Sequence, residues 1–164
     1  MVRLVFMIAF VFAICASMPA RADDVVIGNL KISAAWARAT PKGATVGGGY
    51  FTVTNMGSTP DRLTGGVSDI SNRFEIHEMS MDKGVMKMRA MTAGVEIKPG
   101  QTIRFEPSGY HVMFVGLKEP LKQGDHFKAE LQFEKAGKAS VDFTVEGIGA
   151  RMGGSGGKPM QHGR

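Results

Sequence analysis

The amino-acid sequence predicts an all-β protein, folded as a sandwich or a barrel. Three observations support this prediction. Apolar and polar residues alternate with a period of two in many short runs, and clusters of Gly, Pro, Asn and Asp separate these runs. No run after the N-terminal segment has the length and spacing of an amphipathic helix. Short strands divided by tight turns are typical of sandwiches and barrels.

In the N-terminal half, each expected strand is an apolar or β-branched run that ends at a turn signal. Gly28 and Asn29 separate the first two runs, and we expect the Gly-rich stretch 40–49 to be a loop before the next strand. A turn cluster at 55–61 precedes a further short run. The strands expected here are 25–27, 30–37, 50–54 and 62–67. Trp36 is expected in the core or at its rim.

The C-terminal half shows two hairpin signals. The segment 82–84 ends in glycine between two β-rich runs, and 134–138 separates two further runs. Turns containing Gly or Pro also follow the shorter runs between these hairpins. The strands expected in this half are 74–81, 85–91, 95–97, 102–105, 110–117, 127–133 and 140–145.

The first 22 residues have the features of a signal peptide. Arg3 precedes an apolar run over 4–16, and small residues follow, with an A-x-A site that ends at Ala22. We therefore expect export to the periplasm and cleavage after Ala22, with cleavage after Ala20 as the alternative. The apolar run is too short to span a bilayer comfortably, so a protein embedded in the membrane is not expected.

After cleavage, one domain is expected over residues 23–148, followed by a flexible Gly-rich tail over 149–164. Cys15, the only cysteine, lies in the signal peptide, and the residues before it match a lipoprotein signal poorly. The mature protein should therefore contain neither a thiol nor a disulfide. Any metal site must use other ligands.

Charge and motifs exclude several functional classes. The net charge of +5 is spread along the chain without the basic block of a nucleic-acid-binding face, so no nucleic-acid partner is expected. The sequence has no nucleophile elbow, phosphate-binding loop or metalloprotease helix motif, and we predict that the protein is not an enzyme. A blue-copper electron carrier needs a cysteine ligand, which the mature chain lacks.

Methionine and histidine are arranged unusually. The chain has twelve methionines and four histidines, and "EIHEMSMDKGVMKMRAM", residues 75–91, holds five of the methionines beside His77. Alternate residues of a strand share a face, so His77 lies on the same face as Met79. His111 and Met113 form a second His-x-Met pair in a later strand.

Met86 and Met88 likewise share a face of their expected strand, and the three pairs converge if these strands meet at one end of the sandwich. Neutral thioethers and imidazoles favour Cu(I) over harder ions such as Ca²⁺ or Mg²⁺. Methionine is also a common filler of β cores. The alternative is therefore a β-sandwich binding module outside the cytoplasm that holds no metal.

The same stretches resemble the PCu(A)C family of periplasmic copper chaperones. His77 is followed by ten residues and Met88, then by twenty-two residues and the sequence His111-Val112-Met113. The resemblance covers about 25–147 and includes "WAR" at 36–38 and "GGGYF" at 47–51.

The resemblance implies a cupredoxin-like, immunoglobulin-like β-sandwich or barrel that binds Cu(I). It implies four ligands, which are His77, Met88, His111 and Met113. It further implies delivery of copper to the binuclear centre of cytochrome c oxidase, with subunit II or another copper chaperone as the acceptor.

Four further residues are auxiliary candidates. Met79 and Met86 lie on strands beside the motif and are expected to shield or support the site. Met160 and His162 are soft ligands in the expected tail. Because some family members carry tails rich in His and Met, the resemblance makes this pair a candidate for a second copper ion, as Cu(II).

Overall fold

The computed structural model describes residues 24–153, and this part of the chain contains strands, turns and bends but no helix. Every strand expected from the sequence is present, with small shifts at the ends, which confirms the all-β class. The strands are β1 (Val25–Ile27), β2 (Leu30–Arg38), β3 (Val46–Asn55), β4 (Asp61–Ser68), β5 (Ser71–Asp82), β6 (Val85–Ala90), β7 (Val95–Ile97), β8 (Thr102–Phe105), β9 (Tyr110–Leu117), β10 (His126–Phe133) and β11 (Gly137–Glu146).

The predicted signal peptide, 1–22, and residues 154–164 of the predicted tail lie outside the described residues. Within the described range, no helix has the length and apolar character needed to cross a membrane.

The strands form one mixed sheet. Their order is β6-β5-β9-β8-β3-β2-β11-β10-β4-β7, with β1 beside β2 and an additional pairing of β9 with β3. Most neighbours are antiparallel, whereas β11 runs parallel to β2 and β8 runs parallel to β9. Both expected hairpins, β5–β6 and β10–β11, are present.

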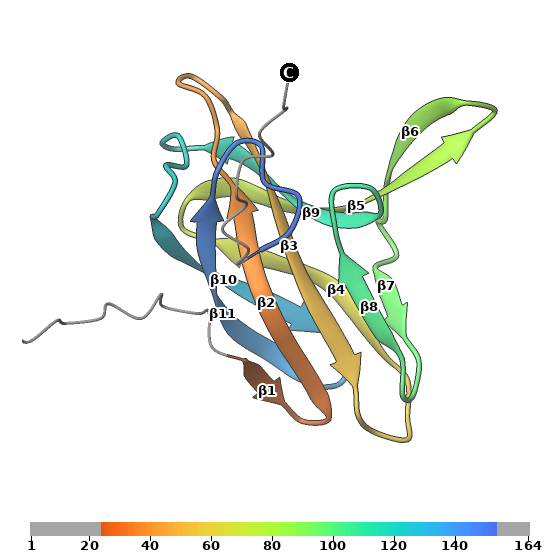
Figure 1. Ribbon diagram of the computed structural model, residues 1–164. Coiled ribbons are helices and arrows are strands. Elements are labelled where there is room, and N and C mark those ends of the chain that lie inside the picture. The colour runs from red at the N-terminus through yellow and green to blue at the C-terminus, as the bar shows by residue number, and fades with distance from the viewer. Residues whose placement is uncertain (1–23, 154–164) are drawn as a thin grey trace, which may run out of the picture.

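The sheet folds over on itself around one core, so that β2 and β3 cross in front of β4 (Figure 1). Phe114 of β9 makes edge-to-face contacts with Phe127 of β10 and Phe143 of β11, at centroid distances of 5.1 and 5.7 Å. In the sheet order, β9 is separated from these two strands by β8, β3 and β2. The two halves of the sheet therefore face each other, as in a sandwich, and stacked aromatic rings fill the space between them.

The N-terminal part of β3 corrects one sequence prediction. Residues 46–49 were expected in a loop, because glycine is rare in strands, yet they are part of β3 and pair with β9. A Cβ atom on Gly49 would lie 2.7 Å from the ring of Phe114 and 2.9 Å from a methyl group of Val112. Glycine is needed here because the core aromatic ring approaches the backbone closely.

A bulge in β2 turns Trp36 away from the core. The register of β2 against β3 shifts between Ser33 and Trp36, and Ala34 lies in the left-handed region with φ 51°. Trp36 pairs with Tyr50 and is tilted against its ring at a centroid distance of 4.4 Å. Gly153 also lies against the indole. Trp36 is thus buried on the outer face of the sheet.

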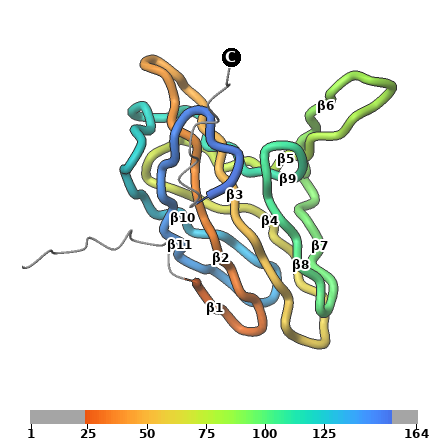
Figure 2. The backbone as a smooth tube through the Cα atoms, in the orientation of Figure 1, coloured from red at the N-terminus to blue at the C-terminus, as the bar shows by residue number. Residues whose placement is uncertain are grey.

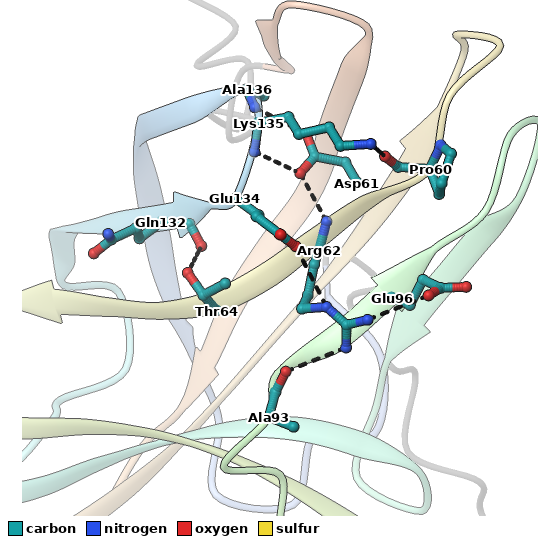
Figure 3. Close-up of polar contacts among 10 residues, drawn as sticks. All are labelled: Pro60, Asp61, Arg62, Thr64, Ala93, Glu96, Gln132, Glu134, Lys135 and Ala136. Atoms are coloured by element: carbon teal, nitrogen blue, oxygen red, sulfur yellow. Dashed lines mark hydrogen bonds and ion pairs between the residues drawn. The ribbon is translucent and has the colours of Figure 1, made fainter.

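Asp61, at the start of β4, holds the β10–β11 turn against the sheet by hydrogen bonds (Figure 3). Its carboxylate is buried and accepts hydrogen bonds from the backbone N–H groups of Arg62, Lys135 and Ala136, at 2.7, 2.9 and 2.9 Å. Arg62 extends the contact with ion pairs to Glu96 and Glu134.

Replacing Asp61 by alanine should therefore destabilise the fold by about 1–3 kcal/mol, because three backbone donors lose their acceptor in a buried place. Urea denaturation followed by circular dichroism measures this loss. Asp69→Ala, at an exposed carboxylate, is the matched control and should change the free energy of unfolding by less than about 0.5 kcal/mol. Equal effects of the two substitutions would contradict this role for Asp61.

The β5–β6 hairpin extends beyond the body of the protein (Figure 2). The proximal part of β5 pairs with β9, whereas the distal part, beyond Glu78, pairs only with β6. All residues of β6 are exposed. This arrangement places the root of the hairpin, with His77, against β9.

Candidate metal centre

The register between β5 and β9 brings two histidines together. His77 lies directly opposite His111, and the centroids of their rings are 5.8 Å apart with an interplanar angle of 40°. Both side chains lie on the outer face of the sheet, because their neighbours Ile76 and Val112 point into the core. The histidines are nevertheless 9% and 7% exposed, so they form a sheltered pair rather than a solvated one.

Two of the predicted methionine ligands lie diagonally from this pair. Met113 is opposite Glu75, and this pair lies two residues along the strands from the His77–His111 pair. On β6, the other neighbour of β5, Met88 is opposite Met79, which lies two residues from His77. Diagonal neighbours on one face of a sheet are within reach of long side chains. The sheet therefore places His77, His111, Met113 and Met88 on one face around His77.

The auxiliary candidates occupy different places. Met79 lies opposite Met88 on the same face as the histidines. Met86 lies opposite Met81, two residues further toward the tip of the hairpin. Met160 and His162 lie outside the described residues. The structure thus brings Met79, but not Met86, next to the histidine pair.

Each histidine has one nitrogen engaged and the other available. His77 Nε2–H donates to the carboxylate of Glu75 at 2.9 Å, and His111 Nδ1–H donates to the carbonyl oxygen of Gly109 at 3.2 Å. These acceptors fix the tautomers, because neither a carboxylate nor a carbonyl can donate. The lone pairs are left on Nδ1 of His77 and Nε2 of His111. Nδ1 of His77 is buried without a hydrogen-bond partner, which is an unusual state for a polar atom.

The surroundings keep the imidazole of His111 neutral. Burial lowers its pKa below the ordinary value of 6.5, and the neighbouring His77 lowers it further, while the hydrogen bond to Gly109 acts in the opposite direction. A histidine with a lowered pKa is uncharged at neutral pH and keeps a free lone pair. That is the state in which imidazole binds a metal ion.

The set of available donors excludes the common hard-metal sites. Among residues 24–153, no group of three or more His, Cys, Asp or Glu side chains is arranged to hold a metal ion. The thioethers of Met113 and Met88 are the soft donors that the strand register places diagonally from the histidine pair. Two imidazoles with thioethers form a donor set that suits Cu(I) and suits Zn²⁺ or Ca²⁺ poorly.

Sequence reasoning missed Glu75 and the carbonyl group of Gly109. The side chain of Glu75 is 36% exposed, and its carboxylate also forms an ion pair with Arg73, with 3.3 Å between Oε1 of Glu75 and Nε of Arg73. A carboxylate that orients a ligating histidine is a common supporting feature of metal sites. The signal was present as Glu-x-His, since residues two apart share a face in a strand.

Comparisons with known proteins agree with this fold. A family model described as "Putative lipoprotein LpqE-like" matches residues 30–145. A protein of Leifsonia xyli subsp. xyli, named as a putative lipoprotein, is 30% identical over 118 residues, which cover 72% of this chain and 70% of the relative.

Solved structures with the same fold include copper-binding domains. The structure titled "Copper-bound PCuAC domain from PmoF2" superposes with a TM-score of 0.65 at 27% identity, covering 76% of this chain and 98% of that domain. The solution structure of apo-DR1885 from Deinococcus radiodurans has a TM-score of 0.57 at 23% identity, covering 88% and 97% of the two chains. The second likeness supports the fold alone.

Proposed function

Because the chain belongs to the LpqE-like family, which is of the PCuAC copper-chaperone type, we propose that it carries Cu(I) outside the cytoplasm and hands it to a partner protein. The observation that carries this proposal is the sheltered His77–His111 pair, in which one buried imidazole nitrogen lacks a partner. A soft cation is the partner that such a nitrogen and the nearby thioethers suit best.

The proposed ligands are Nδ1 of His77, Nε2 of His111 and the sulfur atoms of Met113 and Met88. The two histidines are buried where β5 pairs with β9, whereas Met88 lies on the hairpin and is 53% exposed. The proposed donors are neutral imidazole nitrogens and thioether sulfurs, and copper stays as Cu(I) when it binds. The exposed methionine is the ligand that a competing donor would replace first.

Release to a partner then proceeds by ligand exchange. A donor on the acceptor, such as a thiolate, replaces Met88, and further donors replace the remaining ligands while the copper stays as Cu(I). The proposed acceptor is subunit II of cytochrome c oxidase, for the assembly of its binuclear copper centre, or another copper chaperone. The exported protein would keep a net positive charge after Arg3 and Arg21 leave with the signal peptide, which favours an acidic docking surface on the acceptor.

The proposed location is the periplasm, reached through the signal peptide at residues 1–22. The lipoprotein descriptions of the family and of the Leifsonia relative support a place outside the cytoplasm. In that oxidising space, thioethers are sulfur ligands that disulfide formation cannot consume. We also propose that Met160 and His162 can take up a second copper ion, as Cu(II).

Transfer is tested by mixing the Cu(I)-loaded protein anaerobically with the soluble copper-binding domain of an oxidase subunit II. The two proteins are then separated, and the copper in each is measured. Copper should move to the acceptor. Retention of all copper on the chaperone, with an acceptor that takes free Cu(I), would contradict delivery to this partner. If the protein binds no Cu(I) at all, a β-sandwich binding module without metal becomes the better account.

Glu75 is proposed to position His77 rather than to bind copper. In Glu75→Ala the imidazole of His77 loses its acceptor and its fixed tautomer, so affinity for Cu(I) should fall roughly 10- to 100-fold. Competition with a chromophoric Cu(I) chelator measures the change, and Glu75→Gln, whose amide oxygen can still accept from Nε2, should recover most of it. An unchanged affinity in the alanine variant would remove Glu75 from the account.

A further inference from the structure

The two faces of the β5–β6 hairpin differ sharply in character. On one face, ion pairs join the strands, between Lys87 and Asp82 and between Arg89 and Glu78. Residues on the opposite face continue the row that begins with His77, because they are spaced by two along the strand. That row consists of methionines.

The methionine face contains two cross-strand pairs. Met79 lies opposite Met88, and Met81 lies opposite Met86. Side chains directly opposite each other in an antiparallel pair have Cβ atoms about 5 Å apart, so the flexible thioethers of each pair can meet. Four sulfur atoms thus line one face of the hairpin from the histidine pair almost to the tip.

These methionines are not core residues. Met79 is half-buried, whereas Met81, Met86 and Met88 are 66%, 54% and 53% exposed. Beyond Glu78 the hairpin pairs with no other strand in the described part of the chain. The ion pairs on the opposite face already join the two strands. Exposed methionine adds little to such a hairpin, because β-branched residues stabilise strands better. Core filling, the usual role of methionine, therefore does not explain this row.

Thioethers gathered on an exposed face are soft, neutral ligands for a monovalent soft cation. We propose that Met79, Met81 and Met86 form a second Cu(I) site, composed of sulfur ligands only, on the distal half of the hairpin. This inference rests on the proposed function for its biological meaning, although the site can bind without the histidine pair. Met88 faces Met79 between the two sites, so Cu(I) can pass from one to the other by exchange of thioether ligands, without a change of oxidation state.

The site should be weaker than the histidine centre, because it is exposed and its ligands are held only by a two-stranded ribbon. Its place at the outer end of the methionine row makes it the point at which copper first meets, or last leaves, the protein.

The test is an anaerobic Cu(I) titration of the exported protein against chelators of graded affinity, with X-ray absorption spectra at one and at two equivalents. The wild type should bind two equivalents, and the second should add a shell of sulfur alone. Met81→Leu/Met86→Leu keeps the size and apolar character of both side chains and should lose the second equivalent while the first keeps its affinity. Met56→Leu/Met152→Leu, at two exposed methionines elsewhere, is the matched control and should bind both.

The outcomes separate this inference from the proposed function. A His111→Ala/Met113→Ala variant should lose the tighter equivalent and keep the sulfur-only one. A second equivalent that survives Met81→Leu/Met86→Leu, or that shows nitrogen ligands as the tail histidine would supply, overturns the hairpin site. Binding of only one equivalent by the wild type also overturns it. Absence of the nitrogen-containing equivalent, with the sulfur-only one present, instead overturns the proposed histidine centre.

Discussion

Replacing His77 by alanine is expected to weaken Cu(I) binding by roughly a hundredfold or more, about 2.7 kcal/mol or more in binding free energy. His77 occupies the middle of the site, because β5 lies between β9, which carries His111, and β6, which carries Met88. Its loss removes the imidazole nitrogen whose lone pair is buried without a partner. Apart from His111, no other histidine among the described residues lies on β5 or on the strands that pair with it.

The measurement is competition for Cu(I) with a chelator of known affinity, on proteins whose folded state is checked by circular dichroism. His126→Ala is the control, since His126 is a half-exposed histidine on β10 that contacts Asp142 and Thr144. This variant should bind Cu(I) as the wild type does. Equal affinities of the His77 and His126 variants would show that the histidine pair does not hold copper.

Replacing Phe114 by alanine should destabilise the fold by about 3–5 kcal/mol. Phe114 is fully buried, and its ring contacts Phe74, Phe127 and Phe143 from both halves of the folded sheet. At Gly49 the ring lies directly against the backbone of β3. A paired strand backbone cannot easily move inward, so the cavity left by the ring stays largely open.

Urea denaturation monitored by tryptophan fluorescence and circular dichroism gives the free energy of unfolding of this variant. Val67→Ala, at an exposed position of β4, is the control and should change it by less than about 0.5 kcal/mol. A loss below about 1.5 kcal/mol for Phe114→Ala would mean that the two halves of the sheet do not depend on this aromatic cluster.

Most of the fold could be predicted from local patterns. Alternation and turn residues located each strand, and the glycine of 82–84 located the hairpin that carries Met88. Residues 46–49 were missed, because glycine carries no strand preference and the close approach of Phe114 is a tertiary feature. The bulge at Ala34 was not predicted either, since it reverses the alternation along β2 and leaves no signal in composition.

The candidate site was predictable in part. A period of two placed His77 with Met79 and His111 with Met113, and the family resemblance supplied Met88 as a further ligand. The register between β5 and β9 could not be predicted, because it joins segments about thirty residues apart whose alignment depends on the packing of both core faces. The hydrogen bond from His77 to Glu75 and the available nitrogen that it leaves emerge only from that alignment.

The proposed copper site consists of the His77–His111 pair and its neighbouring thioethers and binds one Cu(I). Its most direct test is the X-ray absorption spectrum of the exported protein with one equivalent of Cu(I), beside a competitive titration of wild type and His111→Ala/Met113→Ala. We expect tight binding of the first equivalent, a first shell that contains both nitrogen and sulfur, and loss of that equivalent in the double variant. Binding that is no tighter in the wild type than in the double variant, or a first shell without nitrogen, would contradict it.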